Sequence, residues 1–117
     1  MARKKRTVTV TGASGFVGRH LVAQLLRDGD VNIRCLLRPG GDTAFLGERS
    51  VSLGVVYGDI TRPQSLQAAF EGSWAVVNLA GYRDFWSRKR EHFYATNEVG
   101  ARNVFEACHS QWCTWRR

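Results

Sequence analysis

The stretch of sequence that decides the fold is Thr7-Val8-Thr9-Val10-Thr11-Gly12-Ala13-Ser14-Gly15-Phe16-Val17-Gly18, residues 7 to 18. Its first five residues alternate β-branched side chains, which suits a strand, and a helical pattern of apolar residues begins at Phe16. Three glycines lie at the turn between the two. The start of such a helix presents free N–H groups and partial positive charge, so the stretch suits binding of a pyrophosphate.

Each of the three glycines has its own expected role. Gly12 allows a tight turn that a Cβ would block, Gly15 lets the backbone approach a bulky anion, and Gly18 lets the helix pack closely on the sheet. Their spacing is G-x-x-G-x-x-G, which differs from the common dinucleotide fingerprint G-x-G-x-x-G. An ordinary strand–turn–helix connection is the alternative, in a chain with 12 glycines. The strand before and the helix after favour dinucleotide binding.

The turn from Thr11 to Gly18 strongly resembles the cofactor turn of the short-chain dehydrogenase/reductase superfamily. The resemblance is greatest to its extended branch, which includes sugar epimerases, dehydratases and dihydroflavonol-reductase-like enzymes. It covers residues 7–108 and only the N-terminal part of that family's fold. It implies a nicotinamide dinucleotide cofactor, with contacts from the turn at Gly12, Ser14, Gly15, Phe16, Val17 and Gly18.

Strand and helix patterns alternate along the rest of the chain. Strands are expected over 31–37, 51–57 and 74–79, and helices over 15–28, 63–71 and 91–108, with a short helical turn within 42–50. This order predicts an α/β fold, a partial Rossmann-type doubly wound parallel sheet with strand order 3-2-1-4. We expect one domain over 1–117, with residues 82–90 as a loop over the cofactor cleft.

Arg38 follows the second expected strand, twenty positions after Gly18. A dinucleotide domain has at this place the residue that contacts the adenosine ribose, and an acidic side chain there binds the 2′-hydroxyl of NAD. An arginine can pair with a 2′-phosphate instead. A surface arginine without a ligand is the alternative. Arg38 therefore predicts NADP(H), with NAD as the alternative cofactor.

Two further segments carry contacts that the resemblance implies. Asp59 would accept a hydrogen bond from the exocyclic amine of the adenine, and Ile60 would cover the ring. Asp59 could instead cap the helix that begins near Pro63, but we expect Thr61 to be that cap. The run Asn78-Leu79-Ala80-Gly81 is similar to the family's segment under the ribose and nicotinamide, which implies cofactor contacts at Leu79, Ala80 and Gly81.

The last expected helix has an apolar face formed by Phe93, Ala101, Val104, Phe105 and Cys108. Asn97 falls within this face, where a polar side chain needs partners, and the resemblance implies that it orders the active-site backbone. The resemblance ends after Ala107. We expect residues 109–117 to be a truncated or aberrant ending.

The family's catalytic pair is Tyr-x-x-x-Lys, and this pattern is absent from the chain. Tyr57, Tyr82 and Tyr94 are followed four residues later by Thr61, Trp86 and Glu98. We therefore identify no catalytic residue and expect no redox or epimerase activity from this chain alone. A non-catalytic half-domain that binds a dinucleotide or a partner is the alternative function.

The net charge of +7 is compatible with nucleic acid, a membrane surface or an anionic cofactor. No RNA-binding motif accompanies the aromatic and basic residues of 82–90, so nucleic acid ranks below the dinucleotide. No apolar run approaches the ~20 residues of a membrane span, and we expect no membrane partner. Strand 74–79 would form an open sheet edge, which predicts self-association.

The chain has three cysteines, and no apolar segment typical of a secretory signal follows the basic residues 3–6. These features predict a reduced compartment, the cytoplasm. Cys35 is expected to be a buried hydrophobic residue and His20 a surface histidine. Cys108, His109 and Cys113 lack a second pair of ligands at metal-binding spacing, so we expect no metal site.

Overall fold

The computed structural model describes residues 5–41, 43–46, 52–80 and 94–115. Four parallel strands form one sheet in the order β3-β2-β1-β4. The strands are β1 (Arg6–Thr11), β2 (Val31–Leu37), β3 (Leu53–Tyr57) and β4 (Ala75–Asn78). The helices are α1 (Phe16–Asp28), η1 (Ala44–Leu46), α2 (Pro63–Phe70), the π-helix η2 (Tyr94–Val99) and α4 (Gly100–Trp115). The predicted α/β class and strand order are confirmed.

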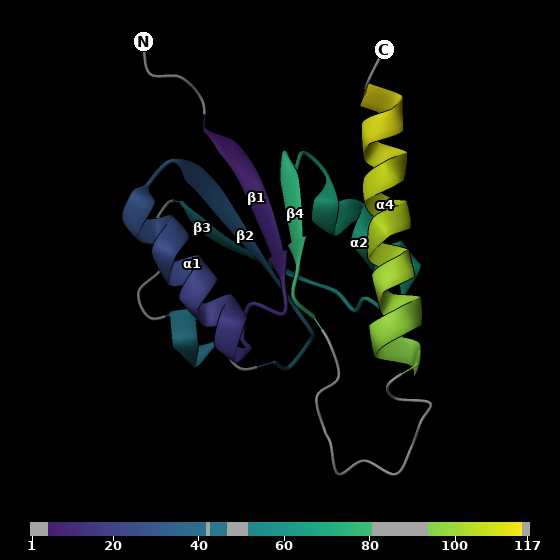
Figure 1. Cartoon of the computed structure of the whole chain (residues 1–117), viewed down its shortest axis with the longest axis horizontal. Helices are drawn as coiled ribbons and strands as arrows, with labels where there is room; N and C mark the ends of the chain where they lie inside the picture. The colour runs from purple at the N-terminus through teal and green to yellow at the C-terminus, as the bar shows by residue number, and fades with distance from the viewer. Residues whose placement is uncertain (1–4, 42, 47–51, 81–93, 116–117) are drawn as a thin grey trace.

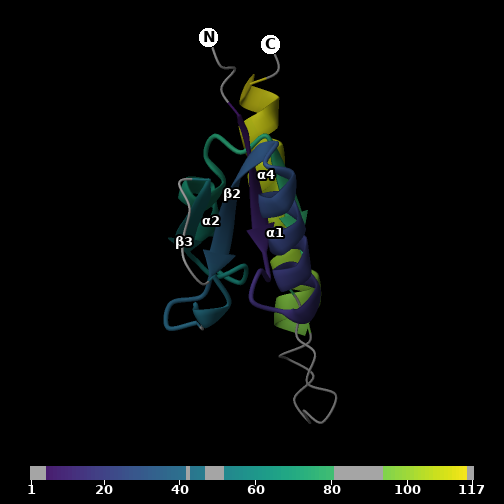
Figure 2. The same ribbon diagram turned by 90° about the vertical axis from the view of Figure 1, so that its left-hand side faces the viewer.

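Helices cover both faces of the sheet, as Figures 1 and 2 show. On the α1 side, Val10, Val22 and Ile33 belong to one buried cluster. On the other side, Phe70 and Val104 belong to a second cluster that joins α2 and α4 to the sheet. Successive side chains of a strand point to opposite faces of the sheet, so Val8 and Val10 of β1 face the α1 side and the residues between them face the other side. Strand β1 lies between β2 and β4, in the interior of the sheet.

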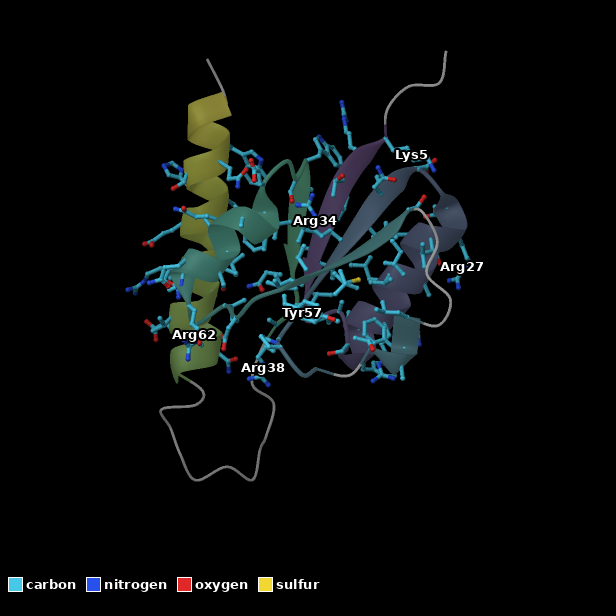
Figure 3. All side chains as sticks on the ribbon, turned by 180° about the vertical axis from the view of Figure 1, so that it is seen from behind. Lys5, Arg27, Arg34, Arg38, Tyr57 and Arg62 are labelled. Carbon is cyan, nitrogen blue, oxygen red and sulfur yellow. The ribbon has the colours of Figure 1, made fainter. Side chains whose placement is uncertain are left out.

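Thr9 and Thr11 of β1 are buried, and both hydroxyl groups form hydrogen bonds. Thr9 is fully buried, and its hydroxyl lies 2.6 Å from the hydroxyl of Ser73. Arg34 of β2 donates from Nη1 to the carbonyls of Ala69 (2.9 Å) and Glu71 (2.7 Å), at the end of α2. Figure 3 labels this arginine. These bonds fasten the carboxyl end of α2 to the sheet.

The last helix continues beyond its predicted end at Cys108. Helix α4 runs to Trp115. The side chain of Gln111 donates to the carbonyl of Gln67 (3.0 Å), and the indole of Trp112 donates to the carbonyl of Ser73 (3.4 Å). The prediction of the helix end was therefore wrong, because Gln111 and Trp112 bind α2 and the turn after it. The interpretation of 109–117 as an aberrant ending stays a prediction.

The apolar face predicted for α4 is confirmed at Val104 and Cys108, which lie in or against the second cluster, and is wrong at Phe105. Phe105 is 74% exposed, whereas its neighbour Val104 is buried. Asn103 is buried too, because its side-chain amide donates to the carbonyl of Ile60 at 2.9 Å. Asn97 is exposed, so its expected place on the buried face was wrong. Phe93 lies outside the described residues.

Candidate functional site

A cleft of about 470 Å³ opens at the carboxyl ends of the four strands. All predicted contacts line it except Gly81, which lies outside the described residues, as does the expected loop 82–90. The lining residues are Thr11, Gly12, Ser14, Gly15, Phe16, Val17, Gly18, Leu36, Leu37, Arg38, Gly41, Gly58, Asp59, Ile60, Leu79 and Ala80. The carboxyl edge of a parallel sheet is the usual ligand position in this architecture.

The turn after β1 has room only for glycine at two of its three glycine positions. Gly12 has φ +67°, and a Cβ there would lie 2.6 Å from backbone atoms of Leu79 and Ala80. A Cβ on Gly18 would collide with the Gly12 carbonyl and lie 2.7 Å from Cα of Ala13. Gly18 therefore allows close packing on the turn itself, rather than on the sheet as expected.

Gly15 is different, because a Cβ there would meet only the Gly12 carbonyl oxygen, at 3.3 Å. Its backbone N–H donates to that same oxygen at 3.1 Å. The first hydrogen bond of α1 runs from the Arg19 N–H to the Gly15 carbonyl at 2.9 Å. The N–H groups of Phe16, Val17 and Gly18 precede it and have no carbonyl within the helix to bind. The first turn of α1 holds no acidic residue, so this end of the helix suits an anion.

Thr11 connects the turn to the segment after β4, a role that the sequence analysis missed. Its buried hydroxyl donates to the side-chain carbonyl of Asn78. The same oxygen accepts from the N–H groups of Leu79 (3.1 Å) and Ala80 (3.2 Å). This arrangement holds the backbone of Leu79 and Ala80 against the glycine turn. The only sequence signal for this role was the position of Thr11, at the end of a strand and directly before a glycine turn.

Asp59 belongs to a tight turn whose hydrogen bonds differ from the prediction. Thr61 donates to Asp59 Oδ1 from its backbone N–H (2.9 Å) and from its hydroxyl (2.7 Å). Thr61 was wrongly expected to cap α2: the N-cap is Arg62, without a side-chain cap. The Asp59 N–H donates to the Ser65 hydroxyl at 3.0 Å, which joins the turn to α2.

The charge of Asp59 is stabilised by its surroundings. Burial by itself would raise the pKa of the Asp59 carboxyl, but the two hydrogen bonds from Thr61 and the charges of Arg38 and Arg62 lower this pKa below its ordinary value. The carboxyl is therefore ionised at neutral pH. Figure 3 shows Arg38 and Arg62 at this end of the molecule, and Arg38 is exposed to the cleft.

In the part of the chain that the structure describes, the other His and Cys side chains form no second site. His20 is exposed, as expected, and its Nδ1 lies 2.7 Å from the Phe16 carbonyl. Cys35 is fully buried, as expected. Burial raises the pKa of the Cys108 thiol, which keeps it protonated at neutral pH. Within the described residues, no three His, Cys, Asp or Glu side chains are grouped as metal ligands, and no helix is long and apolar enough to cross a membrane.

A family model described as the NAD dependent epimerase/dehydratase family matches residues 8–115. This chain belongs to that family. The match extends through α4, so the expected loss of resemblance after Ala107 was wrong.

Two curated relatives are similar to this chain over part of their length. The chain is 37% identical over 100 residues to the ceramide reductase of Caulobacter vibrioides, covering 86% of this chain and 30% of that protein. It is 32% identical over 99 residues to a putative dihydroflavonol 4-reductase of Synechocystis, covering 85% and 27%. The chain therefore spans about 30% of the length of these relatives.

Solved structures share the fold. The Bordetella bronchiseptica enzyme WbmG, in complex with NAD and UDP, matches with a TM-score of 0.75 and 26% identity, over 93% of this chain and 35% of that one. A mutated uronate dehydrogenase matches with a TM-score of 0.74 and 21% identity, over 91% and 36%. At that lower identity the second likeness shows the fold alone.

Proposed function

We propose that this chain is the NADP(H)-binding N-terminal part of an extended short-chain dehydrogenase/reductase or sugar-epimerase-like protein. One observation carries the proposal: at the N-terminus of α1, Phe16, Val17 and Gly18 line the cleft, and their backbone N–H groups have no acceptor within the helix. The pyrophosphate of a dinucleotide fits these donors. When bound, the nicotinamide of this cofactor supplies or accepts a hydride.

We assign the remaining contacts to other residues that line the cleft. Both Thr61 donors end on Oδ1 of Asp59, which leaves Oδ2 to accept from an adenine amine. Ile60 is buried beside it and covers the ring. Leu79 and Ala80, held by Thr11, lie under the ribose and nicotinamide, and Gly81 continues that segment. The family match and the complex of WbmG with NAD and UDP support a dinucleotide cofactor as the ligand.

NADP(H) should bind more tightly than NAD(H). A charge-assisted bond from Arg38 to the 2′-phosphate contributes about 1.5–3 kcal/mol, which is roughly a ten- to hundredfold preference. Titration calorimetry with NADP⁺ and NAD⁺ measures the ratio directly. Gly15→Val, which adds a branched side chain at a residue that lines the cleft, should weaken both cofactors. Equal affinity for the two cofactors would refute the role of Arg38, and full affinity in Gly15→Val would refute the pyrophosphate site.

This chain alone should show no turnover. General acid–base catalysis of the kind that the family's tyrosine provides contributes about 10²–10⁴-fold, and no tyrosine here has a lysine four residues later. Assays of NADPH oxidation with ketones, aldehydes and nucleotide sugars should therefore give background rates. Oxidation that disappears in Tyr94→Phe or Tyr82→Phe would show an active site and contradict this expectation. A binding half-domain without catalysis remains the second candidate.

The open edge of β4 is proposed to associate with a second copy. Within the described residues β4 pairs with β1 alone, and Val76 and Val77 are only half-buried. Unpaired N–H and C=O groups at such an edge favour strand pairing between molecules. Sedimentation velocity should show larger species as concentration rises. A single monomeric species at every concentration would refute the proposal.

The proposed location is the cytoplasm, which the three cysteines support.

A further inference from the structure

The peptide between Ser14 and Gly15 is held at both of its polar atoms. Its N–H donates to the Gly12 carbonyl at 3.1 Å. Its carbonyl accepts from Nε of Arg19 at 2.7 Å. This peptide immediately precedes the free N–H groups of α1, so its orientation decides whether the turn presents donors or an acceptor to the cleft. A rotated peptide would direct the Ser14 carbonyl oxygen toward a bound anion and repel it.

The same guanidinium group of Arg19 also lies over the ring of Phe45, a residue outside the lining of the cleft. Its Cζ lies 5.7 Å from the ring centroid of Phe45, within reach of a cation–π interaction. Phe45 belongs to η1, between β2 and β3, in the segment that begins at Arg38. Leu46, next to it, is buried in the core on the α1 side. An exposed hydrogen bond contributes little when its side chain is free to move, and the ring restricts this movement.

We propose that Arg19 is a positioning residue that fixes the Ser14–Gly15 peptide in the orientation that pyrophosphate binding requires. The inference rests on the proposed function. The pyrophosphate is common to NADP⁺ and NAD⁺, so Arg19 acts on both cofactors equally. Arg38, by contrast, distinguishes them. The ratio of the two affinities therefore separates the roles of the two arginines.

The test compares Arg19→Ala and Arg19→Lys with a matched control, Arg27→Ala, by calorimetry with NADP⁺ and NAD⁺. Arg27 is exposed on the same helix, and its Nη2 donates to Gln24 Oε1 at 2.7 Å. Arg19→Ala should weaken both cofactors about tenfold, the effect of roughly one hydrogen bond, with an unchanged ratio. Arg19→Lys keeps the charge but not the planar group over Phe45, and should also weaken both. Arg27→Ala should bind as the unchanged chain does.

Several outcomes would overturn the inference. Unchanged affinity in Arg19→Ala, or full affinity in Arg19→Lys, would show that the peptide needs no guanidinium. A loss confined to NADP⁺ would make Arg19 a 2′-phosphate ligand instead. If Arg19→Ala fails to fold, Phe45→Leu replaces it, with an expected loss of about threefold for both cofactors, and equal affinity overturns the proposal. Absence of binding to the unchanged chain would refute the proposed function itself, which distinguishes the two failures.

Discussion

Gly12→Ala should lower the free energy of unfolding by about 2–5 kcal/mol, combining left-handed strain of about 1–2 kcal/mol with over-packing of about 1–3 kcal/mol. The strain arises because φ is +67° at this position. The over-packing arises because a Cβ would lie 2.6 Å from the backbone of Leu79 and Ala80, which the hydroxyl of Thr11 holds in place. Since these atoms are backbone, no side-chain rotation can relieve the contact. Urea denaturation measures the loss.

Gly29→Ala is the matched control for this variant. Gly29 ends α1 with φ +72°, and nothing lies within 4 Å of a Cβ built there. Gly29→Ala should therefore lower the free energy of unfolding only by the left-handed strain, about 1–2 kcal/mol. The difference between the variants isolates the steric contact between the turn and the segment after β4. Equal losses would mean that the two segments separate at little cost, contrary to the close packing described above.

Local patterns in the sequence were sufficient for the sheet and for most of the cleft. The alternation of β1 and the glycines after it specify a strand, a turn and a helix start within twelve residues. Arg38 and Asp59 each follow a strand, and parallel strands have their carboxyl ends at one edge. Their meeting in one cleft therefore followed from topology alone, without knowledge of any side-chain contact.

The features that were missed depend on contacts between distant segments. Thr11 binds backbone groups 68 and 69 residues later, and nothing near Thr11 in the sequence indicates these partners. Asn103 can be buried because the Ile60 carbonyl, 43 residues earlier, accepts a hydrogen bond from its side-chain amide. Counting apolar residues alone placed Phe105 on the buried face of α4 and omitted Asn103, whereas Phe105 is exposed and Asn103 is buried. A polar residue with a distant partner cannot be recognised by periodicity.

Thr61 illustrates a different difficulty, which is competition between local hydrogen bonds. A threonine two residues before Pro63 is a reasonable helix cap. Its hydroxyl binds the Asp59 carboxylate instead, since a charged acceptor forms the stronger bond. The same bond lowers the pKa of Asp59. The turn therefore uses Thr61 to hold the carboxylate at the cleft rather than to begin α2.

Arg38→Asp should reverse the cofactor preference under the proposed function. The variant loses a bond of about 1.5–3 kcal/mol to the 2′-phosphate and gains a carboxylate that repels it, so NADP⁺ affinity should fall at least about a hundredfold. NAD⁺ should bind somewhat more tightly, because the new carboxylate can accept from the 2′-hydroxyl. Calorimetry at several salt concentrations measures both affinities.

Arg62→Asp makes the same change of charge at a matched position. Arg62 also lowers the pKa of Asp59, but it is not among the residues that line the cleft. If Arg38 contacts the 2′-phosphate directly, Arg62→Asp should change the ratio of the NADP⁺ and NAD⁺ affinities by less than about threefold. Added salt should remove this small effect. If Arg62→Asp reversed the preference as fully as Arg38→Asp, the net positive field at this edge, and not a bond from Arg38, would be the source of the selectivity.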